Sequence, residues 1–296
     1  MLLLAKTAST IQIKKRTAQP FRKPLMLAVL AMSATLSFGQ PFGVLTYNIR
    51  LDTEQDGVNR WDNRKESMVE LVNRYSPAIF GVQEALYHQV CYLDSALKKY
   101  TYIGVGRDDG KKAGEFSAIF FDSTRLRVIA HSTFWLSEHP DSVSLGWDAA
   151  CRRVCTYGLF EDMLSHKKFW VFNTHFDHVG KVARKNSAEL IVNRINELNG
   201  DNLPVIAMGD FNSNPADEPV KILASTLADG LTCSQKPLNG PVGTFNGFNP
   251  EYLPDERIDY IFVLKVRVLT YSHLTDRREN GLLISDHLPV LAEVEI

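Results

Sequence analysis

The chain reads Pro204-Val205-Ile206-Ala207-Met208-Gly209-Asp210-Phe211-Asn212 in its second half, an apolar run that passes directly into acid and amide groups. Near its end it reads Ser285-Asp286-His287-Leu288-Pro289-Val290-Leu291, with the polar run before the apolar one. A strand fixes the position of a side chain at its end, while the adjoining loop leaves that side chain accessible. The two stretches therefore predict catalytic groups at strand ends and favour a hydrolase.

Polar groups also lie at the ends of other strand-like runs: Asn48 with Arg50, Gln83-Glu84, Thr174-His175 and Arg257-Ile258-Asp259. Each pair alone is explained by a turn or a helix cap. An imidazole held by a carboxylate is a device for proton transfer or phosphate binding, and Asp259 is placed to orient His287. Strand ends gathered at one edge of a sheet would combine these groups into one site.

The fold class follows from runs that are apolar on both faces, with helical patterns between some of them. Such runs predict sheets that are covered by other layers. The expected arrangement is two packed sheets with helices outside them. Strands are predicted at 43–49, 78–83, 117–121, 126–131, 153–160, 169–174, 205–208, 258–263, 266–271 and 289–294, and helices at 64–75, 86–97, 183–198 and 219–227.

The N-terminal residues 1–39 have the pattern of a secretory signal. A basic stretch without acids precedes an apolar run at 25–36, and Ser37-Phe38-Gly39 follows with small residues. The apolar run is shorter than the ~20 residues that a membrane span needs. We therefore expect an exported protein, periplasmic or secreted, that is not an integral membrane protein and whose catalytic domain is residues 40–296.

The charge balance bears on the substrate. The chain has 33 basic and 34 acidic residues, and six of the basic ones but no acid lie in residues 1–39. Residues 40–296 therefore carry 27 basic against 34 acidic residues, a net charge of −7. Proteins that grip nucleic acid without sequence preference usually present a basic surface. A small or tethered phosphate ester is thus as good a candidate as long DNA.

The cysteines and a histidine pair offer two further interpretations. Cys91, Cys151, Cys155 and Cys233 match no zinc motif, and four buried or partly buried thiols are favoured over a disulfide framework, with a single bridge left open. A zinc site built on His175, Asp177 and His178 is disfavoured. If their strand continues, His175 and Asp177 share a face and His178 points away, so a single catalytic His175 is preferred.

Taken in order, these motifs resemble those of the endonuclease/exonuclease/phosphatase superfamily, the deoxyribonuclease I-like fold. The resemblance runs from Tyr47-Asn48 to Ser285-Asp286-His287. It implies an α/β (α+β) fold, a four-layer sandwich of two packed mixed β-sheets flanked by helices. It also implies cleavage of a phosphate ester that depends on Mg²⁺ or Mn²⁺.

The resemblance assigns roles around the metal and the attacking water. Glu84 becomes the principal metal ligand, with Asn48 beside it and Asp286 close to the metal or the nucleophile. Asp210 aligns or deprotonates the water, and Asn212 binds the phosphate. A lone glutamate among oxygen groups suits Mg²⁺, which keeps most of its waters.

It also assigns roles at the phosphate and the leaving group. His287 contacts the scissile phosphate and is oriented by Asp259. His175 lies near the leaving oxygen, and Glu115, in Gly114-Glu115-Phe116-Ser117, is the candidate for its supporting carboxylate. Arg50 stands where apurinic-type repair enzymes have an acid, which argues against DNA repair. Arg50 pairs either with a substrate phosphate or with Asp52.

Three features leave alternatives open. The polar loop from Asp52 to Asp62 either lines the pocket or is solvated. Arg152 and Arg153 are expected as a surface pair, although one of them could reach the site. Phe245, Asn246 and Phe248 could stack a base or sugar, but loop anchoring is favoured.

The leading functional expectation is an exported phosphodiesterase of the nuclease or deadenylase-like exonuclease branch. One alternative is a phosphatase or sphingomyelinase-like hydrolase that acts on a lipid or sugar phosphate head group. Another is a non-catalytic binding module on the same fold. The expected partner is a phosphate-ester substrate such as nucleic acid, a nucleotide or a phospho-head group. We expect a monomer with no stable protein partner.

Overall fold

The structure, a computed structural model, describes residues 39–296. The predicted leader therefore lies outside the described residues, apart from Gly39. Within the described part of the chain, no helix is both long enough and apolar enough to cross a membrane. These residues form two six-stranded sheets.

The first sheet contains one parallel strand pair, β1 with β2, and its other pairs are antiparallel. Across this sheet the strands are β11 (Arg267–His273), β12 (Val290–Glu295), β1 (Phe42–Asn48), β2 (Ile79–Gln83), β4 (Ile119–Asp122) and β3 (Tyr100–Ile103).

The second sheet is built in the same way, with β7 and β8 parallel and the remaining pairs antiparallel. Its strands are β5 (Leu126–Trp135), β6 (Val154–Asp162), β7 (Lys168–His175), β8 (Val205–Asp210), β10 (Asp259–Leu264) and β9 (Ala228–Asp229).

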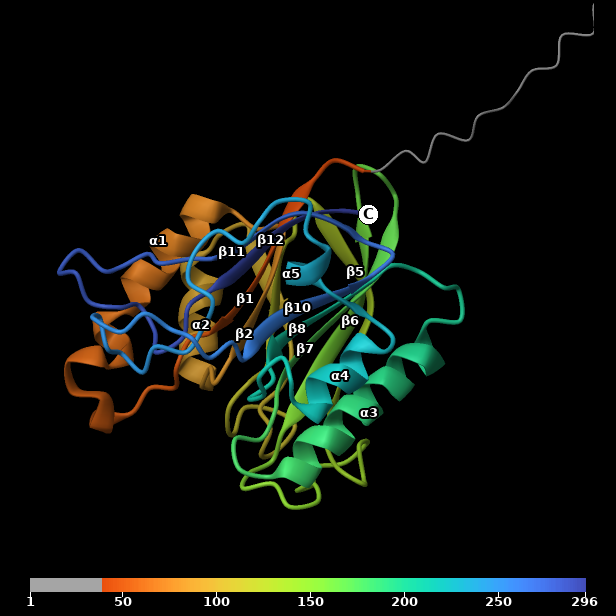
Figure 1. Cartoon of the computed structure of the whole chain (residues 1–296), viewed down its shortest axis with the longest axis horizontal. Coiled ribbons are helices and arrows are strands. Elements are labelled where there is room, and N and C mark those ends of the chain that lie inside the picture. Colours follow the sequence, from red (N-terminus) through yellow and green to blue (C-terminus); the bar gives the residue numbers. More distant parts are fainter. Residues whose placement is uncertain (1–38) are drawn as a thin grey trace, which may run out of the picture. The chain divides into compact units, whose positions relative to one another are not determined.

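Helices cover the outer faces of the two sheets, so that the described residues form four layers (Figure 1). Helices α1 (Lys65–Tyr75) and α2 (Tyr87–Ala96) pack on the first sheet, and α3 (Lys181–Leu198) and α4 (Glu218–Ala224) pack on the second. The short elements are α5 (Gly230–Cys233) and two 3₁₀ helices, η1 (Glu54–Asn59) and η2 (Trp61–Asn63). The predicted sandwich of two mixed sheets is confirmed.

The amphipathic pattern of α1 explains why this helix packs as it does. Met68, Leu71 and Val72 are buried at helical spacing, whereas Glu70 is exposed. The helix ends at Ser76, which is left-handed (φ 45°). Its apolar stripe joins the core on the outer face of the first sheet.

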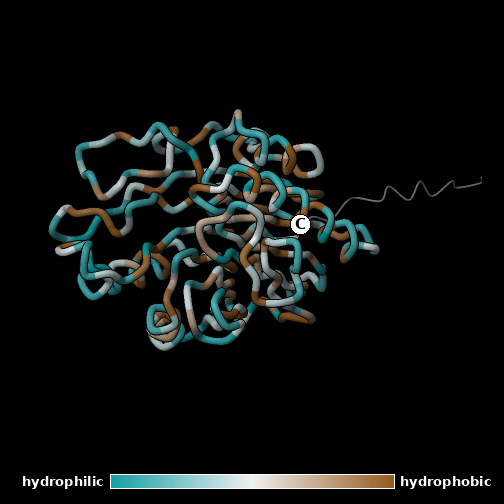
Figure 2. The backbone as a smooth tube through the Cα atoms, turned by 90° about the horizontal axis from the view of Figure 1, so that it is seen from below, coloured by the Kyte–Doolittle hydropathy of each residue, from teal (hydrophilic) through white to brown (hydrophobic). Residues whose placement is uncertain are grey.

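Alternation along β8 shows how one strand serves two cores. Ile206 and Met208 belong to the core between the two sheets, and Val205 and Ala207 face the core under α3 and α4. Figure 2 shows hydrophobic backbone segments in the interior and mostly hydrophilic loops at the periphery. A strand buried on both faces accounts for the continuous apolar run in the sequence.

The predicted strands and helices match the observed ones closely, but two strands and the short helices α5, η1 and η2 were omitted. Strands β3 and β9 were not predicted. Both lie at an edge of a sheet, where only one neighbour constrains the strand, and β9 has two residues. Short edge strands carry little of the hydrophobic pattern that reveals buried ones.

Candidate active site

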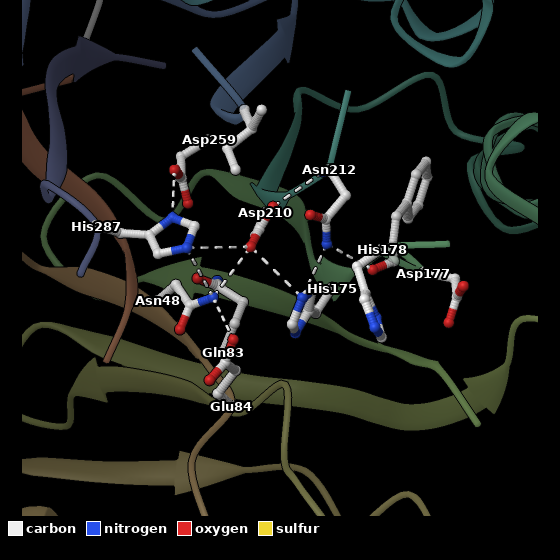
Figure 3. Close-up of polar contacts among 12 residues, drawn as sticks. Asn48, Gln83, Glu84, His175, Asp177, His178, Asp210, Asn212, Asp259 and His287 are labelled. Atoms are coloured by element: carbon white, nitrogen blue, oxygen red, sulfur yellow. Dashed lines mark hydrogen bonds and ion pairs between the residues drawn. The ribbon is translucent and has the colours of Figure 1, made fainter. Parts of the chain in front are cut away.

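Strand direction gathers the polar strand ends into one place. His175 at the end of β7 lies opposite Asp210 at the end of the parallel strand β8. Asp259 at the start of the antiparallel strand β10 is also opposite Asp210. In the other sheet, Asn48 lies opposite Gln83 at the ends of β1 and β2. Figure 3 shows Asn48 from the first sheet and His175 from the second pointing toward Asp210, while Asp259 reaches His287.

Asp210 is the buried centre of the cluster, 1% exposed. Its Oδ2 accepts a hydrogen bond from Asn48 Nδ2 at 3.0 Å, and it lies 3.4 Å from His175 Nε2 and 3.7 Å from His287 Nε2. Its Oδ1 accepts from the Asn212 N–H at 2.9 Å. Burial and the charge of Asp259 raise the pKa of Asp210 to about 7.

His287 is held by the carboxylate that the sequence predicted. Its Nδ1 lies 2.8 Å from Asp259 Oδ2, and Asp259 is completely buried. Burial alone would lower the pKa of His287, but the negative charges of Asp259 and Asp210 hold that pKa well above its ordinary value. The two carboxylates therefore favour the protonated, cationic form of His287, whose Nε2 faces the centre of the site.

Asn48 ties the principal carboxylates together. Its Nδ2 donates to Glu84 Oε1 at 3.0 Å as well as to Asp210, and its Oδ1 accepts from the Arg50 N–H at 3.0 Å. Glu84 Oε2 accepts from the Leu51 N–H at 3.1 Å. In this orientation Asn48 presents its donor to the site, so it positions Glu84 and Asp210 through hydrogen bonds.

Glu84 and Asp286 supply the oxygen atoms that could hold a cation. Burial and the nearby charge of Glu84 raise the pKa of Asp286, against the opposing positive charges of His287 and Arg50. The Arg50 guanidinium lies 3.7 Å from Glu84 and 3.8 Å from Asp286, but its hydrogen bonds go to Asp56. Hard carboxylate oxygens suit Mg²⁺ or Mn²⁺, so the residues fit the predicted metal.

The partner of Arg50 corrects one expectation. Arg50 pairs through two hydrogen bonds with Asp56, at 3.0 and 3.1 Å, and not with Asp52. Asp52 instead pairs with Arg60 and His88. The loop between β1 and α1 turns back through η1, and this brings Asp56 rather than Asp52 to the guanidinium.

Three residues of the site have a left-handed backbone although none is glycine. They are Arg50 (φ 57°), Glu84 (φ 60°) and Asn212 (φ 45°), each directly after or two residues after a strand. This conformation costs about 1–3 kcal/mol for a non-glycine residue and persists where packing enforces it. At Asn212 this conformation turns the backbone N–H back toward the Asp210 carboxylate, while the Phe211 side chain stays in the core.

His175 lies on the opposite side of Asp210 from His287. Its Nε2 is 3.1 Å from Asn212 Nδ2, and Asn212 also donates to the Phe176 carbonyl at 2.9 Å. Burial, with the positive charges of Arg153 and Arg107, lowers the pKa of His175 well below its ordinary value. The imidazole is therefore neutral at pH 7.

Glu115 lies near His175 but makes its hydrogen bond elsewhere. Its Oε2 accepts from Arg107 Nη1 at 2.6 Å, whereas His175 Nδ1 is 3.9 Å away. Arg153 Nη1 is 4.0 Å from the same oxygen. Arg153 is buried, which corrects the expectation of a surface pair, and only Arg152 is half-exposed, 3.5 Å from Asp108.

Asp177 and His178 do not join His175 in a zinc site. Strand β7 ends at His175, and both residues lie to one side of the centre (Figure 3). Cys151, Asp177 and His178 each place one potential ligand atom within 4.8 Å of the others. The Arg153 guanidinium lies among them, 3.4 Å from Asp177 and 3.0 Å from His178, and its charge opposes a cation there.

The cysteines and the loop at 245–248 have separate outcomes. Cys151 and Cys91 are partly buried and Cys155 is buried, but Cys233 is exposed, contrary to expectation.

Asn246 is buried and donates to the Ser285 carbonyl, and Phe248 packs beside the Arg64 guanidinium. Phe245 lies edge-on to His287, with 5.1 Å between ring centroids, and lines the pocket.

A pocket of about 520 Å³ opens over this cluster. The predicted residues that line it are Arg50, Glu84, Glu115, His175, Asp210, Asn212, Asp286 and His287. Asn48 and Asp259 lie behind them through hydrogen bonds to Asp210 and His287. Arg107, which also lines the pocket, was missed, and its only sequence signal was a glycine-rich loop at 104–110.

Two further buried groups were not recognised as parts of the framework. Gln83 donates to Asn173 Oδ1 at 2.6 Å and thereby joins β2 to β7 across the two sheets. Asn173 Nδ2 donates in turn to the carbonyls of Val82 and Ala118. This polar bridge fixes the spacing of the two sheets beside the site.

Comparisons with known proteins agree with this geometry. The model of the Endonuclease/Exonuclease/phosphatase family matches residues 45–287. An endonuclease/exonuclease/phosphatase from Bacteroides vulgatus is 38% identical, with a TM-score of 0.82 over 87% of this chain and 100% of that one. A mannosyl-6-phosphatase of Bacteroides thetaiotaomicron is also 38% identical, with a TM-score of 0.82 over 86% and 99% of the two chains.

A more distant structure shares the fold. The zebrafish (D. rerio) protein TDP2, solved with a single-stranded DNA product, is 16% identical, with a TM-score of 0.68 over 86% of this chain and 99% of that one. The matched family model spans most of the described residues. It includes every strand end of the site, from Asn48 to His287. The chain belongs to the endonuclease/exonuclease/phosphatase family.

Proposed function

We propose that this protein is a divalent-metal-dependent phosphoesterase in which Asp210 activates the attacking water. The observation that carries the proposal is the placement of a buried carboxylate, with its pKa raised to about 7, between two imidazoles at the pocket. A general base works best with a pKa near the operating pH. Asn212 holds Oδ1 of Asp210, so Oδ2 is the oxygen that faces a water.

The metal would be held by Glu84 and Asp286. When bound, Mg²⁺ or Mn²⁺ neutralises charge on the phosphoryl group and orients its oxygens. Asn48 keeps Glu84 in place through its 3.0 Å hydrogen bond. The Arg50 guanidinium lies within 3.8 Å of both carboxylates, which supports this placement because their oxygens then border one position that a cation could occupy.

The two histidines would act on opposite sides of the phosphate. His287 is cationic and donates toward the charge that develops on the phosphoryl oxygens. His175 is neutral in the free protein, and a bound phosphate anion would raise its pKa again. It would then protonate the departing alcohol oxygen.

For the substrate we propose a phosphate monoester of a sugar-like alcohol, rather than the diester that the sequence favoured. The observation that favours it is the 38% identity to a mannosyl-6-phosphatase over nearly the whole described chain. A pocket of about 520 Å³ suits one small molecule. The net charge of −7 on residues 40–296 disfavours a long polyanion.

The test of this function compares two rates. One is the release of phosphate from the monoesters mannose 6-phosphate and p-nitrophenyl phosphate, and the other is the cleavage of the diester bis-p-nitrophenyl phosphate. Each is measured with Mg²⁺, with Mn²⁺ and with chelator. We expect metal-dependent monoester hydrolysis that is lost in Asp210→Asn and kept in Asp201→Asn, whose carboxylate lies exposed in the loop after α3. Preferential cleavage of the diester would refute the monoester assignment, and full activity of Asp210→Asn would refute the mechanism.

We also propose export, which is supported by the basic, apolar and small-residue pattern of residues 1–39. Expression of the full chain in a Gram-negative host, followed by fractionation and mass spectrometry, tests it. The expected product is periplasmic and has lost approximately the first 39 residues. An intact chain that stays in the cytoplasmic fraction would contradict export.

A further inference from the structure

The pocket has a second polar wall beyond His175, which the phosphate chemistry does not use. It consists of Arg107 in the loop after β3, Glu115 in the loop before β4, and Arg153 directly before β6. Trp135 Nε1 donates to the Arg107 carbonyl at 2.7 Å and fixes that loop. We call Arg107, Glu115 and Arg153 the arginine–glutamate wall.

Two nitrogen atoms of this wall, and one ring nitrogen of the neighbouring His175, lack a hydrogen-bond partner in the described part of the chain. Arg107 Nε, Arg153 Nη1 and His175 Nδ1 are buried, and none of them has a hydrogen-bond partner among residues 39–296. Arg153 has a side chain only 5% exposed and still lines the pocket. Buried donors are normally satisfied, so unpaired ones that border a pocket indicate a ligand that carries acceptor atoms.

The charge around these donors indicates what kind of ligand they bind. Arg107 is paired with Glu115 at 2.6 Å, and Arg153 lies 3.4 Å from the carboxylate of Asp177. An anionic group at the wall would meet both carboxylates. A hydroxyl group both donates and accepts, so it can accept from an arginine and donate to Glu115 at the same time.

The position of His175 relates the wall to the substrate. Its Nε2 faces Asp210 and Asn212, where the phosphate would bind, and its Nδ1 faces Glu115. An ester whose leaving oxygen sits at Nε2 therefore extends the rest of its alcohol along this side of the pocket. The wall lies where the alcohol portion would bind.

We propose that the arginine–glutamate wall binds hydroxyl groups of the substrate's alcohol portion and selects polyhydroxylated leaving groups over hydroxyl-free ones. This inference rests on the proposed function and adds the residues that determine specificity. Arg107 and Arg153 donate to hydroxyl oxygens, and Glu115 accepts from a hydroxyl. The phosphate itself stays with Asn212 and His287.

The test compares mannose 6-phosphate with butyl phosphate, a monoester of a hydroxyl-free alcohol, by kcat/KM in the full protein. We call kcat/KM for mannose 6-phosphate divided by kcat/KM for butyl phosphate the preference ratio. In Arg107→Met and in the milder Arg153→Lys we expect this ratio to fall at least about 10-fold. The matched control is Arg127→Met, which removes an exposed arginine paired with Glu161 on the neighbouring strands β5 and β6. It should leave the ratio unchanged.

An unchanged ratio in both wall variants would overturn the proposal. If kcat/KM fell equally on both esters, the residues would have a role in folding or in phosphate chemistry instead. Calorimetry measures how tightly the same two compounds bind to Asp210→Asn, with and without Arg107→Met. The ratio of the two affinities gives the preference without turnover. Failure of wild-type hydrolysis with preferential binding of mannose 6-phosphate would refute only the proposed function. Equal binding of the two compounds, or none, would refute the wall.

Discussion

At the scale of single residues, Asp210 shows how neighbours set chemistry. Its Oδ2 is within 3.0–3.7 Å of polar atoms of Asn48, His175 and His287. Burial raises its pKa, while the same burial lowers the pKa of His175. Desolvation disfavours the charged form of each group, so a base and a neutral imidazole occur side by side at neutral pH.

Glu84→Gln tests the metal assignment. The variant keeps an oxygen near Asn48 but loses the charge that attracts a cation, so the Mg²⁺ concentration for half-maximal activity should rise at least about 10-fold. A titration of activity against Mg²⁺ measures it. Glu70→Gln, on the exposed face of α1, is the control. An unaltered Mg²⁺ dependence in Glu84→Gln would remove Glu84 from the ligand set.

Asp177→Asn tests a pH-dependent contribution to stability. Asp177 accepts from the Val179 and Gly180 N–H groups at 2.9 and 2.7 Å. Burial alone would raise its pKa, but these donors and Arg153 hold the pKa well below its usual range. Because the folded-state pKa is depressed, the stabilisation is present above the unfolded pKa of about 3.9 and is lost as pH falls below it.

We therefore expect Asp177→Asn to lower the free energy of unfolding by about 1–3 kcal/mol at pH 7. The difference from wild type should shrink as the pH falls from about 5 toward 2, since the Asp177 carboxylate then takes up a proton in the unfolded chain but stays ionised in the folded protein. Urea unfolding at several pH values measures it. Asp141→Asn, at an exposed carboxylate, is the control. A difference that stays constant with pH would contradict the assignment.

At the scale of secondary structure, strand direction decides which residues meet. The parallel strands β7 and β8 both end at the site, and the antiparallel strand β10 begins there. In the other sheet β1 and β2 end at the same edge, and Asp286-His287 precede β12, which is antiparallel to β1. Opposite chain directions thus explain why some motifs follow their strands and others precede them.

Gly209→Ala tests how closely β7 and β8 must approach. Gly209 has φ 147°, and an added Cβ would lie 2.0 Å from the Thr174 carbonyl oxygen. Backbone cannot yield by this amount without moving Asp210, so we expect a loss of about 3 kcal/mol or more in the free energy of unfolding, with loss of activity. Thermal unfolding and turnover measure these effects.

Gly200→Ala is the matched substitution for that experiment. Gly200 lies after α3, and no atom is within 4 Å of its added Cβ. Its stability should differ from wild type by less than about 1 kcal/mol. Equal stability of the two alanine variants would show that the contact at Thr174 does not constrain the strands.

At the scale of the described domain, two sheets provide a rigid support for the site. The core between them contains Ile206 and Met208 from β8, beside Val44 and Ile79 from the first sheet. Gln83 and Asn173 bridge the sheets next to the pocket. Because the site draws residues from both sheets, it exists only when the sheets are packed.

The charge of the whole domain predicts weak binding to nucleic acid. With a net charge of −7, residues 40–296 should bind a 20-nucleotide DNA or RNA with a Kd weaker than about 10⁻⁴ M at physiological salt. Fluorescence anisotropy of a labelled strand with Asp210→Asn protein measures it without cleavage. Micromolar binding that weakens steeply with added salt would contradict this and favour a nuclease.

The sequence by itself determined the buried strands and the polar residue types at their ends. Continuous apolar runs reveal strands covered on both faces, and these strands were placed correctly. The order of the motifs also pointed to the family. The pairing of Asp259 with His287 was expected from the resemblance to the family, since the spacing of the two residues in the sequence does not by itself establish it.

Only the tertiary structure decided the partners of the loop residues. It pairs Arg50 with Asp56, turns Glu115 to Arg107, and buries Arg153 in the pocket. Strand positions follow from local hydrophobic periodicity, whereas a side chain in a loop takes its partner from segments far away in the chain. Long-range packing of the loops therefore sets the arginine–glutamate wall of the pocket, which no local pattern describes.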